Sequence, residues 1–420
     1  SGANLDYRAI DSFYDYPRVQ GLAEMMNSYG VIHNDPEVVS KIVASQAHHK
    51  KIDGHAPGLQ GKDLDTYVAA GVYSDHECAT MEDALAKLQR GQFIMIREGT
   101  AARNLEALAP LLTPQYAERC MFCTDDKHPS DLLEKGHIDY IAREAINKYG
   151  VDPIIAVKAA CHHASRYFLL NNRGAIAPGY LADFAVIDNF KDFNVEMVFK
   201  KGILYWNNGE LRDFEAPKIE EYLDKRAHDT FHVSTLTPDD FRDTRQRGVL
   251  GMVPGEIITT DNGYADHVDL EKDILKIAVV ERHKGTHHIG LGYIQGYGLK
   301  SGAVATSISH DSHNIIVVGT NSADMAFAAN YIVEHHGGIV VVENGTVKGD
   351  VVLEIAGIMS DRPLTEVNDQ LEAAKDAAFT LGVSRGIDPF MTLSFMALPV
   401  IPKLRITTRG VIDVDTQQYV

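Results

Sequence analysis

The first 165 residues alternate short apolar runs with helical segments, and this alternation restricts the fold more than any other feature. Each apolar run has the length of a buried strand, and parallel strands need a helix-length connection between them. Helix starts are readable at Asp35-Pro36, at Thr80 and at Asp152-Pro153. We expect an apolar helix over residues 154–170. The pattern predicts consecutive β/α units with strands at residues 19–25, 51–54, 71–74, 93–97 and 119–124.

The rest of the chain changes character twice. A turn-rich stretch from Gly174 to Asp183 leads into a predicted strand at 184–187 and a predicted hairpin at 198–206, with Asn207-Asn208-Gly209 as its turn. Later runs at 274–280, 303–309, 314–318, 338–342 and 351–355 predict strands, and 323–334 and 364–381 predict helices. We therefore expect three domains: an α/β domain over 1–165, a small β element over 166–215 and an α+β domain over 225–420.

The chain is acidic, with 58 Asp and Glu against 40 Lys and Arg and a net charge of -18. Such a surface repels phosphate backbones and anionic lipid, which argues against nucleic-acid and membrane-surface proteins. No apolar run approaches the ~18–20 residues of a membrane span. The first residues carry no basic and apolar signal segment, and the four cysteines are sparse, as in a reducing compartment. These features predict a cytoplasmic protein.

Polar side chains follow each predicted strand of the first domain. They are Glu24, His55, His76, Arg97 and Asp125, and they recur at intervals of roughly 20–30 residues, about one β/α unit. Each residue alone reads more readily as an exposed polar group at a strand end. Because the carboxyl ends of parallel strands converge on one face of a barrel, we expect these residues to meet there. Imidazole and carboxylate donors without thiolate suit Zn, Fe(II), Mn or Ni.

The phrases around these residues resemble the bacterial adenine deaminase family of the amidohydrolase superfamily. The early ones are GLAEMMN at 21–27, DGHAPG at 53–58, SDHE at 74–77 and TDDKHP at 124–129. The later ones are GAIAPGYLADFAVID at 174–188, SHDSHN at 309–314 and GIMSDRP at 357–363. The resemblance covers essentially the whole chain. It implies an α/β fold: strands four to eight of a (β/α)8-type barrel, part of a small β-sandwich and an α+β C-terminal domain.

The resemblance also implies roles for individual residues. Glu24 corresponds to the carboxylate that bridges two metals, and His55 and His76 to the ligands of the second metal. Asp125, rather than its neighbour Asp126, corresponds to the aspartate that binds metal and accepts a proton. The implied cofactors are two divalent ions, Mn²⁺ or Fe²⁺ first and Zn²⁺ as a chemically plausible alternative.

One expected motif is missing, because the His-x-His of the family's first strand does not occur in this sequence. Half a barrel leaves open strand edges and an uncovered core. We expect the missing segment to precede these residues in a longer chain or to come from a second polypeptide. A homodimer is the expected assembly.

The implied reaction is hydrolytic deamination of adenine to hypoxanthine and ammonia by a metal-bound hydroxide, in purine salvage. Asp125 would take the proton of the hydroxide. Glu77 is the candidate acid for the ring nitrogen, or equally a partner that orients a ligand imidazole. The alternatives are an amidohydrolase acting on another cyclic amidine or amide, and a companion or catalytically incomplete chain.

Further residues are candidates for substrate binding. They are Arg97, His128, His310, Asp311 and His313. Arg97 reads alternatively as an ion-pair partner of Glu98, and His128 as an ordinary loop residue. The run from His310 to His313 either closes the active site or forms a hairpin turn, because Asp, Ser and Asn favour turns.

Overall fold

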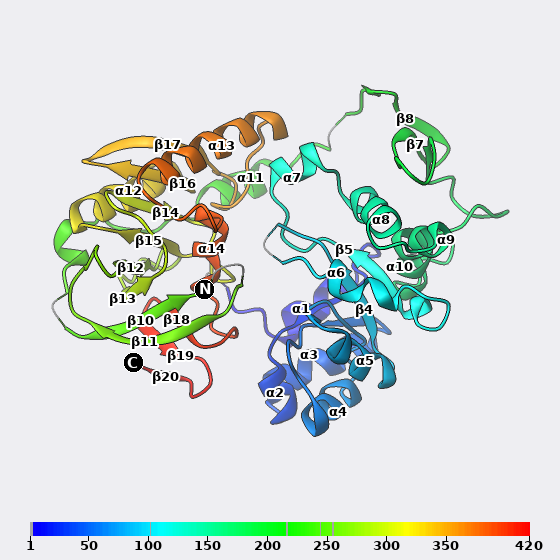
Figure 1. The fold of residues 1–420 in the computed structure, drawn as a ribbon, viewed down its shortest axis with the longest axis horizontal. Coiled ribbons are helices and arrows are strands. Elements are labelled where there is room, and N and C mark those ends of the chain that lie inside the picture. Colours follow the sequence, from blue (N-terminus) through cyan, green and yellow to red (C-terminus); the bar gives the residue numbers. More distant parts are fainter. Residues whose placement is uncertain (1–2, 101, 216, 244, 254–255) are drawn as a thin grey trace. The chain divides into compact units, whose positions relative to one another are not determined.

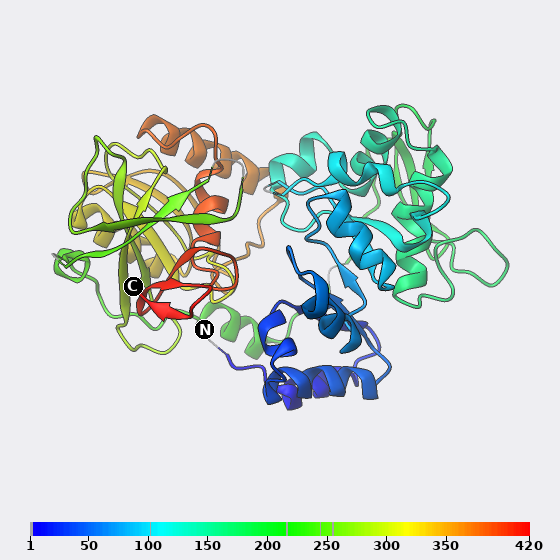
Figure 2. The same ribbon diagram turned by 60° about the horizontal axis from the view of Figure 1, so that its bottom comes forward.

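The computed structural model describes residues 3–100, 102–215, 217–243, 245–253 and 256–420. The chain divides into two compact units. We call Leu5–Ala216 the N-terminal unit, and Pro217–Val420, to which Ala3 and Asn4 also belong, the C-terminal unit. Figures 1 and 2 show that both units contain helices and strands. Among the described residues, no helix is long and apolar enough to cross a bilayer.

Short parallel strands form the centre of the N-terminal unit. β1 pairs with β2, and β4 lies between β3 and β5. The Tyr73 N–H donates to the Ile52 carbonyl at 2.9 Å and thereby links the β3 segment to β2. The strands are β1 (Gly21–Met25), β2 (Lys51–Gly54), β3 (Ser74–Asp75), β4 (Phe93–Arg97) and β5 (Cys120–Cys123).

Helices connect these strands, as the sequence pattern predicts. The predicted N-caps are confirmed: the Asp35, Thr80 and Asp152 side chains accept backbone N–H groups at the starts of α3, α5 and α9. The helices are α1 (Tyr7–Phe13), α2 (Ser28–Ile32), α3 (Pro36–Ala47), α4 (Gly61–Ala69), α5 (Met81–Gln89), α6 (Leu105–Leu108), α7 (Pro129–Glu134), α8 (Ile138–Asn147), α9 (Pro153–Val157) and α10 (His163–Tyr167).

Two local expectations for this unit are wrong. The strand predicted at 71–74 is only Ser74–Asp75, because Gly71 has a φ of 98° and still belongs to the turn after α4. The continuous apolar helix expected after Asp152 is interrupted by a π-helical turn at Lys158–His162. Beyond that turn, the His163 ring lies 2.8 Å from the Cys120 carbonyl, so the bulge holds a buried histidine against β5.

The last part of the N-terminal unit is a four-stranded antiparallel sheet in the order β6-β7-β8-β9. Lys201 and Gly202, both with positive φ, turn the chain between β7 and β8. The turn at Asn208 and Gly209 therefore joins β8 to β9, and the prediction that it belongs to the hairpin over 198–206 is wrong. The strands are β6 (Phe184–Ile187), β7 (Val195–Lys200), β8 (Ile203–Asn207) and β9 (Glu210–Leu211).

An eight-stranded, mostly antiparallel sheet forms the C-terminal unit, in the order β11-β10-β13-β12-β15-β14-β16-β17. Its strands are β10 (Arg247–Met252), β11 (Thr259–Ala265), β12 (Ile274–Val280), β13 (Ile289–Gln295), β14 (Ala303–Thr306), β15 (Ile315–Gly319), β16 (Gly338–Glu343) and β17 (Thr346–Val352). The small sheet beside it contains β18 (Leu404–Thr407), β19 (Gly410–Asp413) and β20 (Gln418–Tyr419). The helices are α11 (Glu221–His228), α12 (Ser322–Glu334), α13 (Leu364–Thr380) and α14 (Pro389–Phe395).

The large sheet buries both of its faces. Ile277 and Val279 of β12 belong to a core shared with α13 and α14, whereas Ala278 and Val280 belong to a core shared with α12. This alternation follows from the two-residue period of a strand. Figure 1 shows α12 and α13 packed along the sheet. The strand predicted at 351–355 is wrong in its bounds, because β17 ends at Val352.

Candidate metal centre at the ends of the parallel strands

The carboxyl ends of the parallel strands carry the predicted ligand residues. Glu24 lies within β1, His55 follows β2, His76 follows β3, Arg97 ends β4 and Asp125 comes two residues after β5. Because the paired strands are parallel, these ends project toward the same edge. The structure brings all five side chains, together with Glu77, into one cluster.

Carboxylates surround the two imidazoles of this cluster. The His76 Nε2 lies 3.0 Å from Glu24 Oε2, 3.2 Å from Glu77 Oε1 and 3.8 Å from Asp125 Oδ2. The His55 Nδ1 lies 3.5 Å from Glu77 Oε1 and 3.8 Å from Glu24 Oε1. The centroids of the two rings are 5.5 Å apart. Two imidazoles and three carboxylates therefore face one another across a few ångströms.

His55 has unmet hydrogen-bonding capacity. Its side chain is buried, and neither ring nitrogen has a hydrogen-bond partner within the described part of the chain. An imidazole in that state is costly unless something else engages it. Ligand atoms of Glu24, His55 and His76 lie within 4.8 Å of one another, and so do those of His76, Glu77 and Asp125. This donor set fits a divalent cation with nitrogen and oxygen ligands.

The charges of the cluster show that a cation is favoured there. Burial opposes protonation of His76, but the Glu24 and Glu77 carboxylates outweigh it and raise the pKa of His76 to about 10. Burial also opposes ionisation of Glu77, yet its hydrogen bond to His76 and the charges of Arg97 and His55 lower the pKa of Glu77 to about 2. A proton on His76 thus balances charge where a metal ion would otherwise do so.

Arg97 contacts two of the acids. Its Nη1 lies 2.5 Å from Glu77 Oε1 and 2.6 Å from Asp125 Oδ2, and its Nη2 lies 3.0 Å from Glu77 Oε2. The guanidinium fork therefore holds the Glu77 carboxylate through both oxygens and reaches Asp125 as well. The geometry gives Arg97 a clear role in fixing these two side chains.

Asp125 lies in a loop that is hydrogen-bonded to the loop after β4. Its φ is 55°, a left-handed conformation that aspartate tolerates better than most residues. The Thr100 N–H donates to the Asp126 carbonyl at 2.9 Å, so the loops after β4 and β5 are joined. A Cβ on Gly99 would overlap the Thr124 and Asp126 carbonyls, which explains why glycine is needed there. The Asp126 N–H donates to Asp125 Oδ1, and it is Asp125 that faces Arg97 and His76.

Two residues that sequence reasoning missed hold the ligand loops. The Tyr67 hydroxyl donates to the Met25 carbonyl at 2.6 Å and accepts from the His55 N–H at 3.0 Å. The buried Asp75 carboxylate accepts from the Ala56 N–H at 2.7 Å and from the Glu77 N–H at 3.0 Å. The position of Asp75, directly before His76, was the available signal for that residue.

The remaining predicted substrate residues have other surroundings. His128 precedes α7, and its N–H donates to Thr100 Oγ1 at 2.9 Å. His310, Asp311 and His313 lie in the C-terminal unit, in the turn between β14 and β15. The His310 ring stacks on Phe395 at 4.8 Å.

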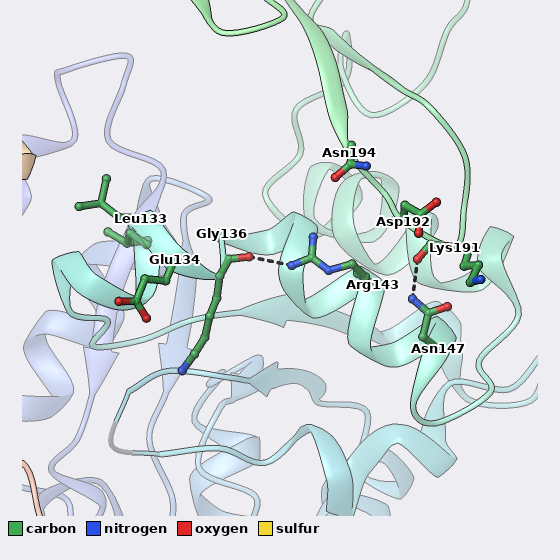
Figure 3. Close-up of a pocket in the computed structure, with 10 residues that line it drawn as sticks. Leu133, Glu134, Gly136, Arg143, Asn147, Lys191, Asp192 and Asn194 are labelled. Carbon is green, nitrogen blue, oxygen red and sulfur yellow. Dashed lines mark hydrogen bonds between the residues drawn. The ribbon is translucent and has the colours of Figure 1, made fainter.

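A separate, polar cavity of about 590 Å³ lies beside α7 and α8 (Figure 3). Arg143 donates to the Lys135 carbonyl at 2.8 Å, and Asn147 donates to the Lys191 carbonyl at 2.5 Å. These donors are occupied by backbone acceptors, and the residues that line the cavity share no member with the cluster of ligand residues. The cavity therefore adds nothing to the candidate metal centre.

Comparison with known proteins assigns the two units to known sequence families. Residues 18–204 match the amidohydrolase family, and residues 256–418 match the adenine deaminase C-terminal domain. Among solved structures, 5-methylcytosine deaminase from Klebsiella pneumoniae is 16% identical, with a TM-score of 0.33 over 51% of this chain and 60% of that one.

Full-length relatives are more similar. The adenine deaminase of Desulfatibacillum aliphaticivorans is 44% identical over 100% of this chain and 74% of that protein. The adenine deaminase of Nitratidesulfovibrio vulgaris strain DP4 is 43% identical over the same shares. Identity of this extent across both units shows that the chain belongs to the adenine deaminase family of the amidohydrolases.

Proposed function

We propose that this protein hydrolyses adenine to hypoxanthine and ammonia at the cluster formed by Glu24, His55, His76, Glu77 and Asp125. Relatives that share more than two fifths of the sequence over the whole chain carry the name adenine deaminase. The observation that carries the proposal is the His55 imidazole. It is buried beside carboxylates, and neither ring nitrogen has a hydrogen-bond partner among the described residues.

The donors present in this chain would supply part of the ligand set for the two divalent ions of this proposal. Glu24 would help to hold the ions, since its two oxygens face His55 and His76. His55 and His76 would hold one ion, and Asp125 would complete the set from the β5 loop. Imidazole and carboxylate donors favour Mn²⁺ or Fe²⁺ in this proposal, with Zn²⁺ as the alternative. Bound divalent ions would supply an activated water at neutral pH and polarise the substrate.

The chain's own residues then move protons and hold the reactants. Asp125 accepts a proton from the attacking water at Oδ2, the oxygen that Arg97 keeps in place. Glu77, which is ionised before the reaction, takes the second proton of the attacking water and passes it to the ring nitrogen beside C6. Asp125 gives its proton to the amino group, which leaves as ammonia. Glu77→Gln tests that role: adenine turnover should fall while bound metal is retained.

In this proposal the parallel strands of the N-terminal unit are strands four to eight of a (β/α)8-type barrel. The domains are 1–165, 166–215 for part of a small β-sandwich, and 225–420. We further propose that the protein is cytoplasmic and forms a homodimer. Light scattering tests the homodimer. His128, His310, Asp311 and His313 remain candidate substrate contacts, and alanine at a true contact should raise the KM for adenine.

The deciding experiment measures ammonia release and loss of adenine absorbance by the 420-residue chain loaded with Mn²⁺. It is run alone and with a polypeptide that carries a His-x-His strand. Asp125→Asn should lower kcat by about 10²–10⁴-fold, the usual contribution of a positioned general base. The matched variant Asp126→Asn should retain far more activity, because it is the Asp125 carboxylate that faces Arg97 and His76.

The proposal fails if metal-loaded chain releases no ammonia from adenine under either condition. Equal losses in Asp125→Asn and Asp126→Asn would assign the proton acceptor to a different residue.

A further inference from the structure

A lysine ammonium is buried in the interior next to the ligand loops. Lys87 of α5 has no exposed surface. Its Nζ donates to the Ala56 carbonyl at 2.8 Å, to Asp75 Oδ2 at 3.0 Å and to Asp83 Oδ2 at 3.0 Å. An ammonium has three N–H donors, so these three acceptors satisfy it fully. Burying it without such partners would be very unfavourable.

Asp75 links this lysine to the backbone next to both candidate histidine ligands. The carboxylate has no exposed surface, and it accepts the Ala56 N–H through Oδ1 and the Glu77 N–H through Oδ2. Ala56 is the residue after His55, and Glu77 is the residue after His76. Both backbone groups of Ala56 and the N–H of Glu77 are therefore fixed by one buried ion pair.

The same place could be mistaken for a metal site. Asp75, Cys78 and Asp83 offer ligand atoms within 4.8 Å of one another, all buried. The Lys87 Nζ contacts both of these carboxylates and lies 3.6 Å from Cys78 Sγ. The cation that these acids require is thus supplied by the chain itself. A permanent cation suits a structural role, because it does not dissociate as a metal ion does.

We propose that Lys87, acting through Asp75, is a positioning residue that holds His55 and His76 in the orientation needed to bind metal. The proposal rests on the metal centre proposed above and concerns how that centre is held. Residues behind metal ligands commonly change metal affinity by 10–100-fold when they are removed.

The test is the Mn²⁺ affinity of the folded 420-residue chain, measured by competition with a chelator. Lys87→Met keeps the length of the side chain and removes its donors, and Asp75→Asn turns one acceptor oxygen into a donor that faces Lys87 and the Glu77 N–H. Each variant should weaken Mn²⁺ binding by about 10–100-fold. Pulsed electron paramagnetic resonance of bound Mn²⁺ should show a weaker ¹⁴N coupling from imidazole than the unsubstituted chain shows.

A matched control is available in the C-terminal unit. Lys276 is also buried, and its Nζ donates to the Phe241 carbonyl at 2.9 Å. Lys276→Met removes a buried lysine in the same way but should leave Mn²⁺ affinity within about threefold, since sites without shared partners behave independently.

The proposal is overturned if folded Asp75→Asn keeps the Mn²⁺ affinity and the ¹⁴N coupling of the unsubstituted chain. If Lys87→Met does not fold, Asp75→Asn alone provides the test. Adenine turnover by the unsubstituted chain is recorded separately. A chain that binds Mn²⁺ without deaminating adenine would refute the proposed function. The Mn²⁺ affinities of the variants, compared with that of the unsubstituted chain, would still test the role of Lys87.

Discussion

Two buried arginines of the C-terminal unit and one of the N-terminal unit are held by different kinds of partner. In the C-terminal unit, the fully buried Arg405 donates to the Ile257, Ile401 and Pro402 carbonyls. Arg282 likewise donates to the Thr230 and Ala356 carbonyls. In the N-terminal unit, buried charges face other ionisable side chains, as Arg97 faces Glu77. A buried charge that contacts only carbonyls stabilises the backbone. A cluster of ionisable side chains can in addition bind and release protons or metal ions.

The strongest test of this difference removes a charge held by carbonyls. Arg405→Met should destabilise the C-terminal unit by about 2–4 kcal/mol, because three buried carbonyls lose their donor. The sole tryptophan, Trp206, lies in β8 of the N-terminal unit, so its fluorescence reports that unit alone. In urea, the circular dichroism transition should move to lower concentration while the tryptophan transition stays in place. A shift of both would show that the units unfold as one.

Exposed Arg409 provides the control for Arg405. Arg409→Met should change the free energy of unfolding by no more than about 0.5 kcal/mol.

A second test acts on a charge held by other charges. Arg97→Lys keeps the charge but loses the fork that grips Glu77 and reaches Asp125. We expect kcat for adenine to fall about 10–30-fold, with KM nearly unchanged, because a misplaced carboxylate slows proton transfer. The opposite split, a raised KM with normal kcat, would favour the predicted substrate contact of Arg97.

A third test is a pH dependence that arises in the N-terminal unit. The pKa of His76 is raised to about 10 from its ordinary 6.5 in the metal-free chain. The stability this gives is fully present below about pH 6.5 and is lost as the pH rises through about 10. Because metal must displace that proton, Mn²⁺ affinity should rise up to about tenfold per pH unit from pH 6.5 to 8.5.

His313 of the C-terminal unit provides the contrast, because burial lowers its pKa to about 4 and it stays neutral over this range. His313→Asn should therefore leave the slope of Mn²⁺ affinity against pH unchanged. A flat profile in the unsubstituted chain would contradict the account of His76.

The sequence predicted the ligand positions because strand ends in parallel β/α units are fixed by length and by helix caps. His55 and His76 could be placed in this way, and so could the N-caps Asp35 and Thr80. The Lys87 and Asp75 pair could not. Lys87 stands four residues after Asp83, a spacing typical of an exposed helix pair, and only the tertiary fold buries it.

Strands β10 and β13 were also missed, for a related reason. They contain Gly248, Gly251, Gly290 and Gly292, and glycine weakens any strand prediction. A Cβ on Gly290 would overlap the Thr407 carbonyl of β18, so the contact that requires glycine is remote in sequence.

The hydrogen bonds between the loops after β4 and β5 limit how the sequences of these loops can change. Gly99 leaves no room for a methyl group beneath the segment that carries Asp125, and Thr100 binds that segment through both its N–H and its hydroxyl. Neither segment can be exchanged alone without disturbing the other. In a chimera with a related enzyme, residues 98–104 and 124–131 should therefore both come from the same parent protein.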